Sequence, residues 1–318
     1  MYDPESGFYS RAGGPSRRRD FLTSPGLGPL FGAVVARALD TWWRDLGAPE
    51  PFHVIEAGAG DGALAKAILG SGPDCRPALR YVAVETATVL RLLHPPEVTS
   101  LAEMPAGALE GVVVANELLD NLPFRLLQRA PDGWAELFVD EEGHEVLAPA
   151  RPEAAAGADW LAPGAPPGTR IPLQDQAANW LRAALATLSR GRVVVIDYAD
   201  TTPNLATRHW TEWVRTYRAN GPGAPPLEAV GEQDITCEVA LDQLASVRPP
   251  TVDRSQAEFL RAHGLDELAA EARQSWQQQA HVGDLTALKH KSRLTEAAAL
   301  TDPQGLGAFR VLEWVVSE

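Results

Sequence analysis

The chain has 318 residues, of which 45% are hydrophobic and 22% are charged. This length and composition fit a folded protein of two domains, or one large domain with an insertion, and they exclude wholesale disorder. Asp and Glu outnumber Lys and Arg by 42 to 28, which gives a net charge of −14. A surface of that sign repels phosphate backbones, so nucleic-acid binding is disfavoured and a cationic partner is favoured.

The cysteine content and the length of the apolar runs exclude further classes of protein. Cys75 and Cys237 are the only cysteines and form no metal-ligand spacing, so we expect neither a disulfide framework nor a metal site. The longest apolar runs fall far short of the roughly 18 residues that a membrane span needs. The arginines at 17–19 resemble the start of a twin-arginine export signal, but an amphipathic pattern follows them. The sequence therefore predicts a cytoplasmic protein, with a homodimer as one option for its assembly.

Residues 27–46 keep the spacing of an amphipathic helix that buries one face. Thr23 or Ser24 can cap this helix, and Pro25 suits its first turn. After it, short β-rich runs alternate with helical stretches, which is typical of a parallel sheet built from βαβ units. The pattern predicts strands at 52–56, 81–85, 111–115 and 192–197, and helices at 63–69 and 174–188.

The second half of the chain departs from this alternation. Between Phe124 and Val146, Asp-Gly and Glu-Gly turns predict antiparallel ribbons, and 163–172 is typical of a linker loop. We expect a core at 1–200, an inserted and mainly helical lobe at 201–301, and a closing strand within 302–318. The predicted helices of the lobe are 255–263 and 266–279, and the closing strand is 307–316.

The strongest local signal is a glycine-rich turn directly after the first predicted strand. Gly58, Gly60 and Gly62 alternate there ahead of a helix, and glycine lets a ligand touch backbone that a Cβ would otherwise shield. About 25 residues later the second strand ends at Glu85, where a carboxylate can accept both ribose hydroxyls of an adenine nucleoside. The pattern predicts an adenosine cofactor in a Rossmann-like fold.

Two cofactors satisfy this pattern. Gly58-x-Gly60-x-x-Ala63 matches the relaxed fingerprint for a dinucleotide, which keeps NAD open. Glu56, two residues before the first glycine, would repel a pyrophosphate but can hold a cationic amino group. That arrangement favours S-adenosylmethionine (SAM).

Polar residues also follow the third predicted strand. Asn116, Glu117 and Asp120 stand at its carboxyl end, where ligands bind in open α/β sheets. An isolated pair of acids there is more often a solvated helix start. The neighbouring glycine turn favours a functional site.

Six motifs occur in a fixed order along nearly the whole chain. They are Tyr2-Asp-Pro-Glu-Ser-Gly-Phe-Tyr9, Asp20-Phe-Leu-Thr-Ser-Pro25, Glu56-Ala-Gly-Ala-Gly-Asp-Gly62, Asn116-Glu-Leu-Leu-Asp-Asn-Leu-Pro123, Asp197-Tyr198 and Gly231-Glu-Gln-Asp-Ile-Thr236. This order resembles the MidA-like class I SAM-dependent methyltransferases, whose mitochondrial members are complex I assembly factors that act as protein arginine methyltransferases.

The resemblance implies a seven-stranded Rossmann-like methyltransferase sheet, an inserted lobe that helps to cover the substrate, and SAM as the methyl donor. It implies that Thr23, Ser24 and Asn116 join Glu56, Glu85 and the three glycines in the cofactor site. Three positions depart from the family, since Gly26 and Ala33 replace acids and Asn220 replaces a histidine. These departures bear on the acceptor more than on SAM.

An arginine acceptor needs help from carboxylates, because a neutral guanidinium at pH 7 costs on the order of 7 kcal/mol. We expect Glu117 and Asp120, with Asn116 beside them, to grip the guanidinium and take up its proton. His209 and the pair Asp197-Tyr198 are weaker candidates for the same crevice. Three functions stay open: a protein methyltransferase, a small-molecule O- or N-methyltransferase, and a non-catalytic SAM-binding assembly factor.

Overall fold

The computed structural model describes residues 23–218, 221–228, 230–279 and 285–317. These residues form two compact units. The core unit comprises residues 23–117, 184–196 and 250–317, and the lobe unit comprises residues 118–183 and 197–249. This division differs from the boundaries expected from the sequence, because 118–183 packs with the lobe and 250–301 packs with the core.

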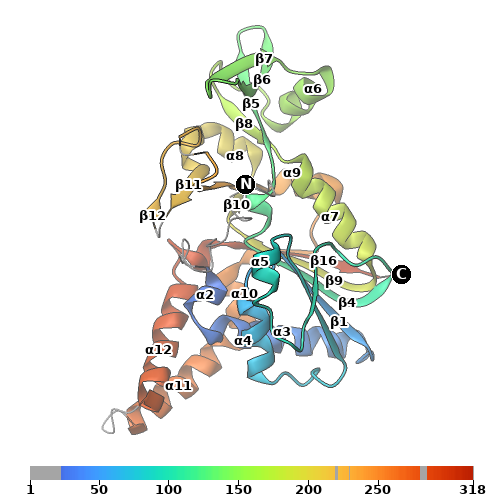
Figure 1. Ribbon diagram of the computed structural model, residues 1–318, viewed down its shortest axis with the longest axis vertical. Helices are drawn as coiled ribbons and strands as arrows, with labels where there is room; N and C mark the ends of the chain where they lie inside the picture. Colours follow the sequence, from blue (N-terminus) through green and yellow to red (C-terminus); the bar gives the residue numbers. More distant parts are fainter. Residues whose placement is uncertain (1–22, 219–220, 229, 280–284, 318) are drawn as a thin grey trace. The chain divides into compact units, whose positions relative to one another are not determined.

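A seven-stranded sheet forms the centre of the core unit, in the order β3-β2-β1-β4-β9-β16-β15 (Figure 1). Within the run β3-β2-β1-β4-β9 each adjacent pair of strands is parallel, whereas β15 and β16 pair antiparallel. Their bounds are β1 Phe52–Ala57, β2 Leu79–Val84, β3 Thr99–Leu101, β4 Leu109–Asn116, β9 Leu188–Asp197, β15 Val252–Ser255 and β16 Arg310–Val316. The four predicted parallel strands and the closing strand are therefore confirmed to within a few residues.

Two glycines let the central strands approach one another. Gly111 in β4 pairs with His53, and a Cβ at Gly111 would lie 1.9 Å from the His53 carbonyl oxygen. Gly191 in β9 pairs with Gly111, and its Cβ would lie 1.8 Å from the Gly111 oxygen. No side chain fits at either position, so glycine is required where these three strands meet.

Helices cover the sheet of the core unit. They are α2 Ser24–Leu27, α3 Pro29–Asp45, α4 Ala63–Ser71, α5 Thr88–Arg91, α10 Gln256–Ala262, α11 Leu265–Gln279 and α12 Leu285–Leu300, with a 3₁₀ turn at Leu306–Ala308. The predicted amphipathic helix is α3, which buries Phe31, Val34 and Leu39 against α4 and the sheet. Thr23 caps α2 by accepting the Gly26 N–H, so the cap precedes a separate short helix. The pair α11 and α12 runs side by side (Figure 1).

The lobe unit is built on a four-stranded antiparallel sheet in the order β7-β6-β5-β8. Its strands are β5 Arg125–Ala130, β6 Gly133–Val139, β7 Glu145–Pro149 and β8 Arg170–Leu173. The predicted ribbons are confirmed, but the prediction of a linker over 163–172 is wrong at its end, because Arg170–Leu173 pairs with β5. The proline and glycine content of residues 163–172 is typical of a loop, so the sequence pattern does not indicate this strand.

Short elements complete the lobe unit. They are the 3₁₀ turns η1 Leu119–Asn121 and η2 Trp210–Glu212, the helices α6 Pro152–Leu161, α8 Thr202–Thr207 and α9 Leu241–Val247, and the strands β10 Ala199–Asp200, β11 Val214–Arg218, β12 Gly221–Pro222, β13 Asp234–Cys237 and β14 Val239–Ala240. Helix α7, Asp175–Thr187, and strand β9 cross from one unit to the other. Within the described ranges, no helix has the length and apolar character of a membrane span.

Candidate functional site

The glycine turn lies between β1 and α4 and is tied to β2. The Gly58 N–H donates to the Val84 carbonyl at 2.9 Å. Gly58, Gly60 and Gly62 all have left-handed backbone, with φ of 69°, 54° and 78°, which explains the alternating glycines. A Cβ at Gly60 would point into open space, so the turn leaves room for a ligand against its backbone.

Glu85 directly follows β2 and its carboxylate faces this turn. Its Oε2 accepts the Gly60 N–H at 3.0 Å, and its Oε1 accepts the Ala87 N–H at 2.8 Å. Arg91 donates to the carbonyls of Glu85 and Thr86, both at 2.7 Å. The Thr86 hydroxyl also donates to Oε1, at 3.4 Å. These bonds fix the orientation of a half-buried carboxylate, and Oε2 keeps a further lone pair for an outside donor.

His94 holds the other side of the same peptide group. Its Nε2 lies 2.9 Å from the Gly60 carbonyl oxygen, and its Nδ1 lies 2.9 Å from Ser100 Oγ. Since a carbonyl only accepts, Nε2 carries the proton in this contact. No spacing in the sequence marks His94 as a site residue, because it reaches a turn 34 residues away along the chain.

Glu56, at the end of β1, is buried and paired with a phenol. Tyr81 donates its hydroxyl proton to Glu56 Oε2 at 2.7 Å. Burial raises the pKa of Glu56 to about 8, because desolvation outweighs the hydrogen bond from Tyr81. The Glu56 carboxyl group is therefore mostly protonated at neutral pH, until a cation beside it favours the ionised form.

Asn116 and Glu117 end β4 and are held by α2. Glu117 Oε1 accepts the Ser24 N–H at 3.2 Å and the Asn116 side-chain N–H at 3.1 Å. Ser24 Oγ in turn donates to Gln256 Oε1 at 3.0 Å, which anchors α2 to α10. Thr23, Ser24, Asn116 and Glu117 thus lie in one hydrogen-bonded neighbourhood of the core unit.

Two features of this neighbourhood destabilise the folded protein. Glu117 has left-handed backbone with φ of 51°, a conformation that L side chains rarely adopt and that concentrates at functional sites. The buried Asn116 Oδ1 has no hydrogen-bond partner among the residues that the structure describes. An orphaned acceptor of this kind costs about 1–3 kcal/mol unless a donor reaches it, so its position fits a ligand donor at the end of β4.

Asp120 belongs to the lobe unit, three residues beyond Glu117. It is buried, and it accepts hydrogen bonds from the Tyr198 hydroxyl and, at 2.8 Å, from the Asn121 side chain. Burial raises the pKa of Asp120 to about 6. The neighbouring Asp197 accepts the backbone N–H groups of Leu119 and Asp120 at 3.0 and 3.3 Å. Asp197 and Tyr198 therefore position Asp120, and the pairing of Asp120 with Glu117 stays a prediction.

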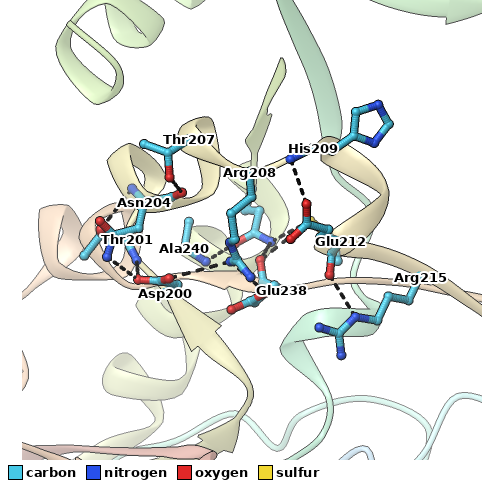
Figure 2. Close-up of polar contacts among 12 residues, drawn as sticks. Asp200, Thr201, Asn204, Thr207, Arg208, His209, Glu212, Arg215, Glu238 and Ala240 are labelled. Carbon is cyan, nitrogen blue, oxygen red and sulfur yellow. Dashed lines mark hydrogen bonds and ion pairs between the residues drawn. The ribbon is translucent and has the colours of Figure 1, made fainter. Parts of the chain in front are cut away.

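A further polar cluster of the lobe unit surrounds Arg208 (Figure 2). The Arg208 guanidinium lies 2.9 Å from Glu238 and 3.6 Å from Asp200. His209 caps η2, since its N–H donates to Glu212 and its ring bonds Thr211. These local contacts account for His209.

The departures from the family pattern fall in two places. Gly26 lies in α2 and Ala33 in α3, where both are part of regular helix. Asn220, Arg17 to Arg19 and the motifs at 2–9 and 20–22 lie outside the described residues. Among the residues that the structure does describe, no cluster of His, Cys, Asp and Glu could hold a metal ion.

Comparison with known proteins identifies the class of this fold. A sequence profile described as S-adenosyl-L-methionine-dependent methyltransferase matches residues 34–253. The chain belongs to this family. The expected Rossmann-like fold, the resemblance to MidA-like methyltransferases, the methyltransferase activity and SAM as the cofactor are confirmed.

Two solved structures from Burkholderia thailandensis are similar over 99% of this chain at 27% identity. One is bound to S-adenosyl-homocysteine, with a TM-score of 0.79 and 85% of its own chain covered. The other is a native structure with a TM-score of 0.81 and 84% covered.

Curated relatives are named protein arginine methyltransferase NDUFAF7, mitochondrial. The rat protein is 25% identical over 314 residues, which cover 84% of this chain and 69% of the rat protein. The Drosophila melanogaster homologue is 29% identical over 172 residues, which cover 44% of this chain and only 39% of the fly protein. The prediction of a cytoplasmic protein is wrong by this comparison, since these relatives are mitochondrial; cysteine content reports a reducing environment and does not separate compartments of that kind.

Proposed function

We propose that this methyltransferase transfers the methyl group of SAM to the guanidinium of arginine side chains in a protein. The observation that carries the proposal is the end of β4, where a strained backbone presents Glu117 beside the orphaned Asn116 Oδ1. A carboxylate and an amide oxygen are the acceptors that a guanidinium requires. The name of the rat relative supports the same acceptor class.

The core unit supplies the residues that fit the cofactor. The open space at Gly60, in the left-handed turn of Gly58, Gly60 and Gly62, suits close approach of an adenosine, and we assign the ribose hydroxyls to Glu85. Glu56 would bind the cationic amino group of SAM. That positive charge would lower the raised pKa of Glu56, so the carboxyl group would lose its proton. Thr23, Ser24 and Asn116, which lie near Glu117, would complete the cofactor site. When bound, SAM supplies an electrophilic methyl group, so no covalent protein nucleophile is needed.

The chain's own residues then have two tasks toward the acceptor. Glu117 would orient the guanidinium and localise its charge away from the attacking nitrogen. Asp120, whose pKa is raised to about 6, would take up the proton near neutral pH.

Radiolabelled SAM tests the acceptor class. The protein is incubated with a cell lysate and labelled SAM, and the products are separated into protein and small-molecule fractions. We expect label in protein, released as methylarginine on acid hydrolysis, and at least 100-fold less label with Glu117→Gln. Label confined to small molecules, or to other amino acids, would refute the proposal.

A further inference from the structure

The β6–β7 hairpin of the lobe unit exposes a group of apolar side chains. Phe138 and Val139 end β6, Val146 and Leu147 lie in β7, and each is between 44% and 51% exposed. The strand register places Phe138 opposite Val146 and Leu137 opposite Leu147. Because side chains alternate between faces, both faces of this end of the hairpin are apolar. We call residues 138–147 the outer hairpin.

The outer hairpin also presents a free sheet edge. Strand β7 is the first strand in the order β7-β6-β5-β8 and pairs with β6 on one side (Figure 1). An edge strand leaves alternate N–H and C=O groups open to another chain, and proteins usually guard such edges with Lys or Pro. In β7 the only such residue is Pro149, at the end of the strand, and residues 145–148 contain neither.

Acidic side chains surround this apolar edge. Residues 138–147 include Asp140, Glu141, Glu142 and Glu145 but no Lys or Arg. Asp140 accepts the His144 N–H at 2.7 Å and so orders the tip, while Glu141 and Glu142 are exposed. Glu145 pairs with Arg170 at 2.6 Å. Glu141 and Glu142 are therefore the acids of the outer hairpin that can attract a cationic partner.

We propose that the outer hairpin binds an extended segment of the methyl-acceptor protein that alternates basic and apolar residues and adds to β7 as a further strand. Backbone bonds to the β7 edge would give affinity. Val146 and Leu147 face opposite sides of the sheet, so the apolar side chains of the segment would pack on Val146 and its basic side chains would pair with Glu141 and Glu142, which would give selectivity. A second copy of this chain fits poorly, because it would bring an equally acidic tip to the same edge. The assignment of the partner as a methyl acceptor rests on the proposed function.

A defined peptide tests this surface without methyl transfer. The probe is a fluorescein-labelled peptide of about twelve residues in which Lys and Val alternate. We expect saturable binding by fluorescence anisotropy, weakened at least tenfold in Val146→Lys and in the double variant Glu141→Lys/Glu142→Lys. A peptide with Glu in place of Lys, and one with a central Pro that blocks strand addition, should bind at least tenfold more weakly.

Leu288→Lys is the matched control, because Leu288 is a 52% exposed apolar residue of α12 in the core unit. It should leave peptide affinity unchanged, and thermal melting checks that every variant folds. The double variant changes only exposed tip residues, so it decides the question if Val146→Lys fails to fold.

Three outcomes would overturn the proposal: no saturable binding, equal binding of the Lys and Glu peptides, or unchanged affinity in the variants. Light scattering that shows a dimer of the wild type and a monomer of Val146→Lys would assign the edge to a second copy instead. Because the assay measures binding alone, failure of arginine methylation would leave its result standing.

Discussion

Glu117 and Asp120 are three residues apart, but they belong to differently built regions. Glu117 ends a parallel strand of the core unit, where left-handed backbone and the Ser24 N–H hold its side chain. Asp120 sits in a buried turn of the lobe unit, held by Tyr198 and Asn121. The difference shows that two neighbouring acids can have separate environments: one is displayed at a strand end by strain, and the other is enclosed so that its pKa rises to about 6.

Of the variants that test this difference, Glu117→Gln should change the rate of methyl transfer most. The amide keeps an oxygen for the Ser24 N–H but loses the charge that orients a guanidinium, so the single-turnover rate of methyl transfer should fall about 100-fold or more. Binding of S-adenosyl-homocysteine, measured by isothermal titration, should change little. Glu110→Gln, at the opposite end of β4, is the control and should keep the wild-type rate. An unchanged rate in Glu117→Gln would remove this residue from the mechanism.

Glu85→Ala tests the cofactor side of the core unit. Loss of two charge-assisted hydrogen bonds to a ribose should weaken binding of S-adenosyl-homocysteine about 10- to 100-fold by isothermal titration. Glu97→Ala removes an exposed acid of the same connection and should leave binding unchanged. If both variants bind like the wild type, the assignment of Glu85 to the ribose is wrong.

The contrast between the two regions also explains what the sequence could predict. The strands around Val54 and Val113, the glycine turn and Glu85 follow from local periodicity and spacing, and the structure places all of them as expected. The lobe depends on pairings between distant segments, so its Arg170–Leu173 strand and the tie between Asp120 and Tyr198 carry no local signal. Strain at Glu117 is likewise invisible in a sequence, because it results from how the strand end is held.

Asp120→Asn separates the chemistry of the lobe acid from its packing. Asparagine can still accept the Tyr198 hydroxyl, but it cannot take up a proton, so the methylation rate near pH 7.5 should fall about tenfold. The wild-type rate should rise as pH increases through about 6, and the variant should lack this rise.

Stability gives a second measure of the same group. The pKa of Asp120 is about 6 in the folded protein and about 4 in the unfolded chain, so the folded form binds more protons between these values. The stability contributed by this group is therefore present below about pH 4 and is lost as pH rises to about 6. The melting temperature of the wild type relative to Asp120→Asn should fall across that range. If the melting temperatures of the wild type and of Asp120→Asn change with pH in the same way, the pKa of Asp120 is not raised.

His94→Ala has the smallest expected effect. It tests whether the hydrogen bond from His94 to the Gly60 carbonyl helps to hold the glycine turn. Removal of one neutral hydrogen bond to the Gly60 carbonyl costs about 1 kcal/mol, which weakens binding of S-adenosyl-homocysteine about fivefold. His94→Gln should restore most of the affinity, because its amide can donate to the same oxygen. His144→Ala, at the exposed tip of the outer hairpin, should bind like the wild type. If His94→Ala and His94→Gln lose affinity equally while both fold normally, the Gly60 contact is not what His94 contributes.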